Sequence, residues 1–156
     1  MSIEKVKLAI KMMESTGEEI LFTGGVSDKD ITDAESRLGL EFPLDYKYFL
    51  GIYGSLSFEG ESFYGLTQFG LDVGEIPCVI FATESARKRT DISNNMIYIK
   101  ASGYGPLFSL HLSDSKKHSP VVETSLSYKR HKEIKILANS FGDFFYDEIK
   151  AAIEDL

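Results

Sequence analysis

The chain has 156 residues, of which 43% are hydrophobic and 26% are charged, and its net charge is −7 at neutral pH. This length fits one domain with a sizeable core, and the ordinary hydrophobic and charged fractions exclude wholesale disorder. The single cysteine, Cys78, cannot form an intramolecular disulfide, which excludes the class of small disulfide-stapled secreted domains.

The first predicted element is an N-terminal helix that ends at Gly17, because apolar residues from Ile3 to Met13 follow a loosely helical spacing. Charged side chains such as Glu4 and Lys5 interrupt this apolar run, and no small-residue cleavage site follows it. The sequence also contains no run of about 18 apolar residues, which a membrane-spanning helix would need. We therefore expect a cytoplasmic protein without a signal peptide and without a membrane partner.

A second helix is predicted after the turn pair Gly24-Gly25. Ser27 is a candidate N-cap with Asp30 three residues further on, and Gly39 stands where a left-handed C-cap is favoured. The apolar face of this helix falls at spacings of three and four, on Ile31, Ala34 and Leu38.

A third helix follows a short extended connector, and the fixed φ of Pro43 suits its first position. Gly54 ends this helix. Its apolar residues cover more than one face, so we expect burial on several sides; they are Leu44, Tyr46, Tyr48, Phe49, Leu50, Ile52 and Tyr53. The stretch from 31 to 54 is therefore interpreted as scaffold.

The rest of the chain alternates between strand and helix patterns. It predicts a β-hairpin around Gly60, a helix over 77–90, and strands over 96–102, 106–112 and 119–125. A final helix carries an apolar stripe on Phe141, Phe144, Phe145, Ile149 and Ile153. Together these elements predict one α+β domain over residues 1–156.

One succession of residues, I-x3-E-x2-L-G-L-x-F-P-x-D-Y-K-x-F-L-x3-G, precedes the hairpin, and S-F-x-D-F-F begins the last helix. Over residues 27–150 this pattern resembles the SUKH superfamily, which includes the Smi/Knr cell-wall-regulator family. Two positions depart from it, because Phe42 stands where the family usually has Leu, and Tyr53 where it commonly has Asn. The matching residues are Ile31, Glu35, Leu38, Gly39, Leu40, Phe42, Pro43, Asp45, Tyr46, Lys47, Phe49, Leu50, Gly54, Ser140, Phe141, Asp143 and Phe144.

The resemblance implies a mainly antiparallel sheet flanked by N-terminal helices and a C-terminal helix. It also implies a function, because bacterial members are largely immunity proteins that bind and neutralise a cognate toxin, often a nuclease. Fungal relatives regulate cell-wall synthesis and act as interaction hubs, so a regulatory interaction module without a toxin is the alternative. The family has no shared catalytic residues, and we therefore expect no enzyme and no cofactor.

The histidines and the cysteine are the candidate residues for catalysis and metal binding. His111, His118 and His131 show no metal-ligand spacing, and Cys78 lies in an apolar run that is typical of a buried, inert thiol. We expect no metal site. A small enzyme that uses Cys78 with a sequence-distant histidine is a third hypothesis, because such pairs assemble in space.

A basic tract, SYKRHK at 127–132, has the composition of a short nucleic-acid contact. The tract is brief and the chain is acidic, so we do not expect nucleic acid as a partner.

The acidic charge is concentrated in residues 27–77, which hold ten acidic and three basic residues. A field of this sign attracts basic partners. Four acidic residues fall in predicted loops of this region, and we expect them to bind the partner: Glu59, Glu61, Asp72 and Glu75. The sequence leaves open whether the protein forms a homodimer.

Overall fold

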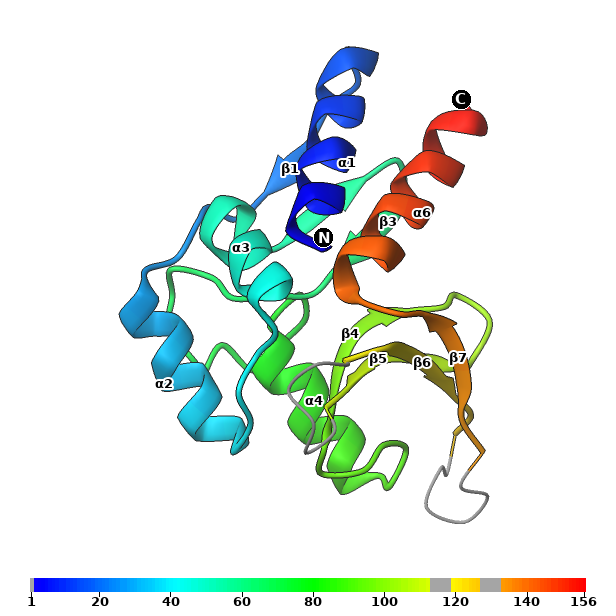
Figure 1. Cartoon of the computed structure of the whole chain (residues 1–156). Coiled ribbons are helices and arrows are strands. Elements are labelled where there is room, and N and C mark those ends of the chain that lie inside the picture. The colour runs from blue at the N-terminus through cyan, green and yellow to red at the C-terminus, as the bar shows by residue number, and fades with distance from the viewer. Residues whose placement is uncertain (1, 113–118, 127–132) are drawn as a thin grey trace.

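A computed structural model of the protein describes residues 2–112, 119–126 and 133–156 (Figure 1). Its helices are α1 (Ser2–Thr16), α2 (Asp28–Leu38), α3 (Leu44–Tyr53), α4 (Val79–Lys88) and α6 (Phe141–Glu154). Its strands are β1 (Leu21–Phe22), β2 (Leu56–Phe58), β3 (Glu61–Phe63), β4 (Met96–Ala101), β5 (Leu107–His111), β6 (Val121–Thr124) and β7 (Lys135–Ala138). The predicted α+β fold is confirmed. None of the described helices is long and apolar enough to cross a membrane.

The strands form two antiparallel sheets, with the orders β1-β2-β3 and β4-β5-β6-β7. Directly after β3, the backbone N–H of Tyr64 donates to the carbonyl of Ile99 in β4 at 2.8 Å. The predicted antiparallel pairing is therefore present, and the two sheets are tied together where the hairpin ends.

Successive residues of β5 face opposite layers of the molecule. Leu107 packs with Ala86 of α4 in a small apolar cluster below the four-stranded sheet. The next residue, Phe108, turns to the other face, where its ring lies 5.8 Å from that of Phe144 in α6. The four-stranded sheet is thus sandwiched between α4 and α6 (Figure 1).

The centre of the core is a cluster of aromatic rings around α3. Phe49 is fully buried, and its ring lies 5.2 Å from Phe141 and 5.6 Å from Phe145, both on α6. Leu44 and Ile52 are exposed, so one side of α3 faces solvent. The predicted burial is therefore confirmed for the side that carries Phe49 and is wrong for Leu44 and Ile52.

Local capping explains where the helices begin and end. The Ser27 hydroxyl accepts a hydrogen bond from the Asp30 N–H at 3.2 Å, and Gly39 closes α2 with a left-handed φ of 73°. Pro43 is the N-cap of α3 and not its first helical residue. At α6, the Ser140 hydroxyl accepts from the Asp143 N–H at 3.1 Å.

Asp45 joins the two halves of the SUKH-like pattern. This buried residue lies in the first turn of α3, where its Oδ1 accepts from the Tyr46 N–H at 2.9 Å. Its Oδ2 accepts from the Gly142 N–H at the start of α6, also at 2.9 Å. One carboxylate therefore satisfies free N–H groups at the starts of two helices.

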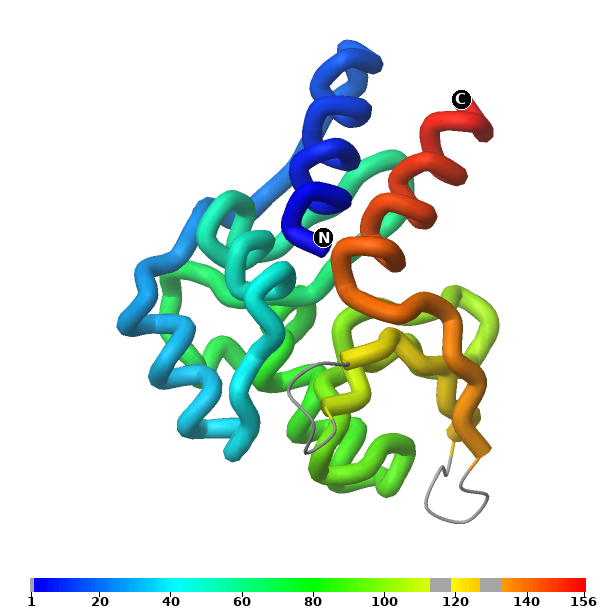
Figure 2. Tube along the Cα trace, in the orientation of Figure 1, coloured from blue at the N-terminus to red at the C-terminus, as the bar shows by residue number. Residues whose placement is uncertain are grey.

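The start of α6 also abuts the start of α1. A Cβ on Gly142 would lie 2.0 Å from the Ser2 carbonyl oxygen, so only glycine fits there. From this contact α1 and α6 run side by side (Figure 2).

Candidate protein-interaction surfaces

The four acidic residues predicted to bind a partner fall into two separate places. Glu59 and Glu61 belong to the β2–β3 hairpin, whose strand β3 packs against α6. Asp72 and Glu75 lie in the loop that precedes α4, on the side of α2 (Figure 1). The structure therefore separates the predicted group into two pairs.

In the hairpin, the two glutamates differ in exposure and in charge compensation. Glu59 is exposed at the turn, with a φ of 48°. Glu61 forms an ion pair with Lys100 of β4, and the Nζ–Oε2 distance is 2.6 Å. The Lys100 side chain is only 7% exposed and lies within 5.8 Å of the ring centroids of Phe63 and Phe108. The carboxylate of Glu61 thus neutralises a buried cation inside the protein.

One further glutamate, Glu148, approaches the hairpin residue Glu61 from the C-terminal half. Burial raises the pKa of the half-buried Glu148 in α6; nearby Lys100 lowers it, and the charges of Glu61 and Asp147 raise it again. The neighbourhood of Glu61 therefore contains an ionisable group that the sequence pattern did not single out.

The sequence pattern also did not indicate a role for Glu123 of β6. Its Oε1 accepts a hydrogen bond from the Tyr104 hydroxyl at 2.8 Å, and this bond is the main reason why the pKa of Tyr104 is raised. Glu148 contributes to the same shift, so Tyr104 links these two glutamates to one surface. No local signal in the sequence brings together residues so far apart in the chain.

On the other side of the molecule, Arg37 of α2 bridges the loop and α4. Its Nη1 lies 3.0 Å from Asp72, while its Nε and Nη2 hold the carboxylate of Glu84 in α4 at 2.9 and 3.1 Å. The hydrogen bond to Glu84, followed by that to Asp72, raises the pKa of Arg37. Asp72 is nevertheless 86% exposed and Glu75 is exposed, so both are accessible to a partner.

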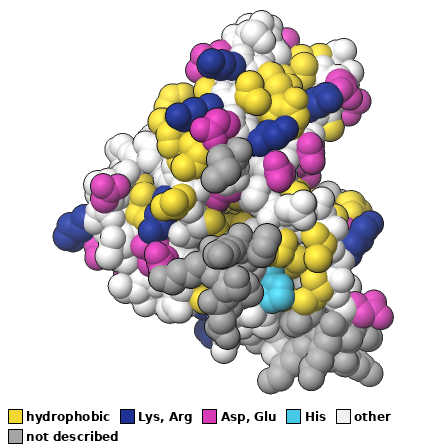
Figure 3. Space-filling model, viewed as in Figure 1, with side chains coloured by type: hydrophobic (Ala, Val, Ile, Leu, Met, Phe, Trp, Pro, Cys, Tyr) yellow, Lys and Arg dark blue, Asp and Glu magenta, His cyan; other side chains and the backbone are white. Residues whose placement is uncertain are grey.

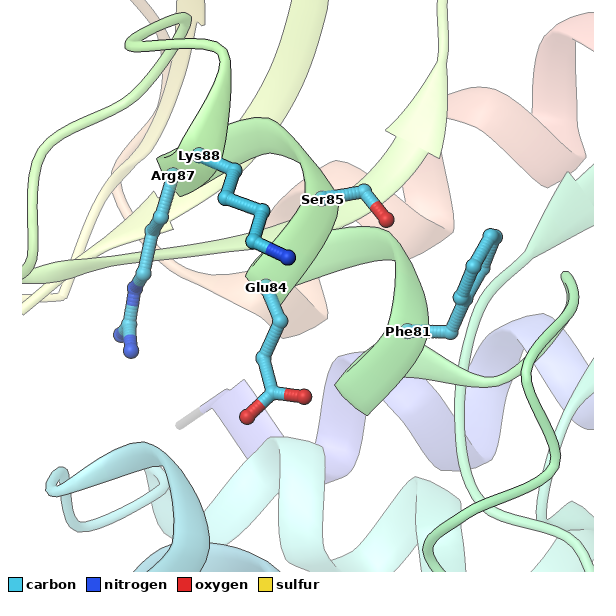
Figure 4. Close-up of a pocket in the computed structure, with 5 residues that line it drawn as sticks. All are labelled: Phe81, Glu84, Ser85, Arg87 and Lys88. Atoms are coloured by element: carbon cyan, nitrogen blue, oxygen red, sulfur yellow. The ribbon is translucent and has the colours of Figure 1, made fainter.

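An open hollow of about 650 Å³ lies along α4 and is lined by Phe81, Glu84, Ser85, Arg87 and Lys88. Figure 4 shows Phe81 and Arg87 pointing to opposite sides of the helix, with Glu84 and Lys88 between them. Arg87 has a structural role, because its guanidinium donates to the carbonyls of Leu38, Asn94 and Met96. It therefore ties α4 to the end of α2 and to the start of β4.

The face that carries α1 and α6 has mixed charge. Figure 3 shows acidic and basic side chains interspersed there around hydrophobic ones. The Lys5 ammonium lies 4.3 Å above the ring of Tyr146, and that of Lys7 lies 5.6 Å from the ring of Tyr48. These lysines cover aromatic surface, which is typical of a solvated helix face.

The hypothesis of a cysteine–histidine enzyme finds no support among the described residues. Cys78 is fully buried at the N-cap of α4, whereas His111 lies at the end of β5 with its Nε2 3.2 Å from Asn95 Nδ2. Burial lowers the pKa of His111. In the described ranges, no group of three or more His, Cys, Asp or Glu side chains is placed to hold a metal ion. His118, His131 and the basic tract 127–132 lie outside the described residues.

Comparison with known families identifies the chain. The model of the SUKH_6 family, described as SMI1-KNR4 cell-wall, matches residues 28–145. A search of curated proteins found no match. The matched range contains α2, α3 and the start of α6, whose capping residues Asp45 and Ser140 carry the pattern seen in the sequence. The chain therefore belongs to the SUKH superfamily, within its SMI1-KNR4 cell-wall family.

Proposed function

We propose that the protein is a non-enzymatic immunity protein of the bacterial, YobK-like type, which binds and neutralises a cognate toxin in the cytoplasm. The observation that carries the proposal is the family match over residues 28–145. It is supported by a difference among the acidic residues, of which some have structural roles and others are exposed. Asp45 and Glu35 have structural roles: Asp45 caps α6, and Glu35 accepts from the Phe42 N–H at 2.7 Å. Other carboxylates of the acidic region remain exposed.

The exposed carboxylates suit a basic partner. A nuclease-type toxin must present a positively charged surface to phosphates, and carboxylates at matching positions block that surface. Glu59, Asp72 and Glu75 are the exposed members of the predicted group. Long-range attraction between these charges and the toxin speeds association, and salt screens it over about 8–10 Å at physiological ionic strength.

The test is to co-express the neighbouring toxin gene with wild-type protein and with a Glu59→Lys, Asp72→Lys, Glu75→Lys variant. Glu61 stays unchanged, because it neutralises the buried Lys100 and its loss would disturb the fold. A matched control changes Glu14, Glu18 and Glu19, which are also exposed, to lysine. We expect wild type and control to protect cells and the loop variant to fail, with all three showing the same unfolding midpoint. Equal protection by the folded loop variant would rule out this surface.

A regulatory interaction module is the second candidate, because the matching family is described as SMI1-KNR4 cell-wall. It predicts that no toxin gene accompanies this one and that loss of the protein alters cell-wall growth. A homodimer fits either function and is checked by light scattering of the purified protein.

A further inference from the structure

The loop between β3 and α4 turns some apolar side chains inward and others outward. Leu71 and Val73 pack against the main core. By contrast, Phe69 is 90% exposed and Ile76 is 55% exposed. An aromatic ring so fully in water forgoes the free energy of burial, which makes it a candidate contact for another molecule.

Hydrogen bonds and an ion pair anchor this loop on both sides of Phe69. The Phe69 N–H donates to the Thr67 hydroxyl at 3.2 Å, and the Gln68 amide donates to the Gly25 carbonyl at 3.4 Å. Further along, Asp72 pairs with Arg37 at 3.0 Å. These contacts fix the backbone around Phe69 before binding, which lowers the entropy cost of ordering the loop in an interface.

The charge of the loop defines the chemistry of its partner. Between residues 68 and 76 the only charged side chains are Asp72 and Glu75, and both are acidic and exposed. Asp72 stays 86% exposed although it pairs with Arg37, whereas Glu61 in the hairpin pairs with the buried Lys100. The loop thus carries an exposed aromatic ring and two exposed carboxylates, which are the residue types of an apolar interface anchor and of a polar rim.

We propose that the 68–76 loop is the centre of the partner interface, and that Phe69 inserts into an apolar pocket of a basic protein whose lysines or arginines pair with Asp72 and Glu75. This inference rests on the proposed function for the identity of the partner. It adds a residue, Phe69, that the acidic pattern alone did not single out.

A random peptide library displayed on phage tests this surface without a toxin. Immobilised wild-type protein is the bait, and enriched peptides are then measured against a Phe69→Ser variant and a Leu44→Ser control. Leu44 is a matched control because it is 72% exposed on α3. We expect the peptides to combine an aromatic or aliphatic residue with lysine or arginine. Their binding should weaken at least tenfold in Phe69→Ser and stay unchanged in Leu44→Ser.

Three results would overturn the inference: no enrichment, enrichment of acidic peptides, or equal binding to Phe69→Ser and wild type. Measurements of toxin binding and neutralisation distinguish failure of this inference from failure of the proposed function. If the toxin binds wild type and Phe69→Ser equally, the protein is an immunity protein that uses another surface. If loop-binding basic peptides are found but no toxin is neutralised, the docking surface stands and the immunity function fails.

Discussion

Phe49 is the residue on which most of the aromatic core converges, with rings from α6 and from β3 packed near it. Because its side chain is fully buried, Phe49→Ala should lower the free energy of unfolding by about 3–5 kcal/mol, the usual cost of deleting a buried aromatic ring. Chemical denaturation measures this directly. The exposed Leu44→Ala is the control and should change stability by less than about 1 kcal/mol. An unchanged midpoint for Phe49→Ala would contradict the position of α3.

The ion pair between Lys100 and Glu61 is asymmetric, because the lysine is 7% exposed and the glutamate 32% exposed. Glu61→Gln leaves a buried ammonium without its carboxylate and should lower the free energy of unfolding by about 1–3 kcal/mol. Lys100→Met keeps the apolar stem and leaves a carboxylate that water can reach, so its effect should be smaller. Urea denaturation of both variants checks the order, and the reverse order would refute it.

Glu148 gives a pH-dependent prediction. Burial is the main reason why its folded-state pKa lies above the ordinary value of 4.5. The ionised form therefore destabilises the fold at neutral pH, and this cost disappears as pH falls through the folded pKa towards 4.5. Glu148→Gln should raise the melting temperature at pH 7, with a gain that shrinks on acidification. A gain that is the same at pH 7 and pH 4 would show that charge is not its cause.

At the scale of elements, the junction between α3 and α6 depends on one carboxylate. Asp45→Ala removes the acceptor for the N–H groups of Tyr46 and Gly142, and the unfolding free energy should fall by about 1–3 kcal/mol. Asp45→Asn keeps an oxygen acceptor and should cost less. Thermal melts of both variants test this, and equal losses would show that the negative charge, and not the hydrogen bond, holds the junction.

The helices were predictable because their end signals are local. Ser27 and Gly39 act in the structure as the sequence indicated, each within a few residues of the backbone group with which it interacts. Strands β1 and β7 were not predicted. They are 2 and 4 residues long, and β7 is defined by its partners, as in the pair of Ile136 with Val122. Such edge strands owe their structure to the sheet and not to their own pattern.

The candidate surfaces were less predictable than the fold. The sequence identified Asp72 and Glu75 as accessible acids, and they are exposed. It gave no sign that Glu61 pairs with Lys100, or that Glu148 approaches the same site from α6, because these contacts exist only after distant segments pack. Phe69 was missed because most phenylalanines of this chain lie in the core, and only tertiary structure distinguishes the exposed ones, Phe22, Phe69 and Phe81.

At the scale of the whole molecule, the scaffold residues are separated in space from the residues that we propose bind a partner. The residues that define the family lie at caps and in the aromatic core, around Asp45 and Phe49. Three exposed acids of the proposed interface, Glu59, Asp72 and Glu75, lie in the hairpin and in the 68–76 loop, on two sides of this scaffold (Figure 1). Surface loops therefore have room to change partner specificity while the core stays the same.

The most direct test of the account is a titration of toxin activity. The purified product of a toxin gene found beside this one is held at a concentration far above the dissociation constant expected for the complex, and its activity is measured as this protein is added. If the protein neutralises the toxin by binding, toxin activity should fall linearly and reach zero at a fixed molar ratio of protein to toxin, such as one to one. Inactivation by trace amounts would show catalysis, and full activity at excess would show that the protein does not neutralise that toxin; either result would contradict the account.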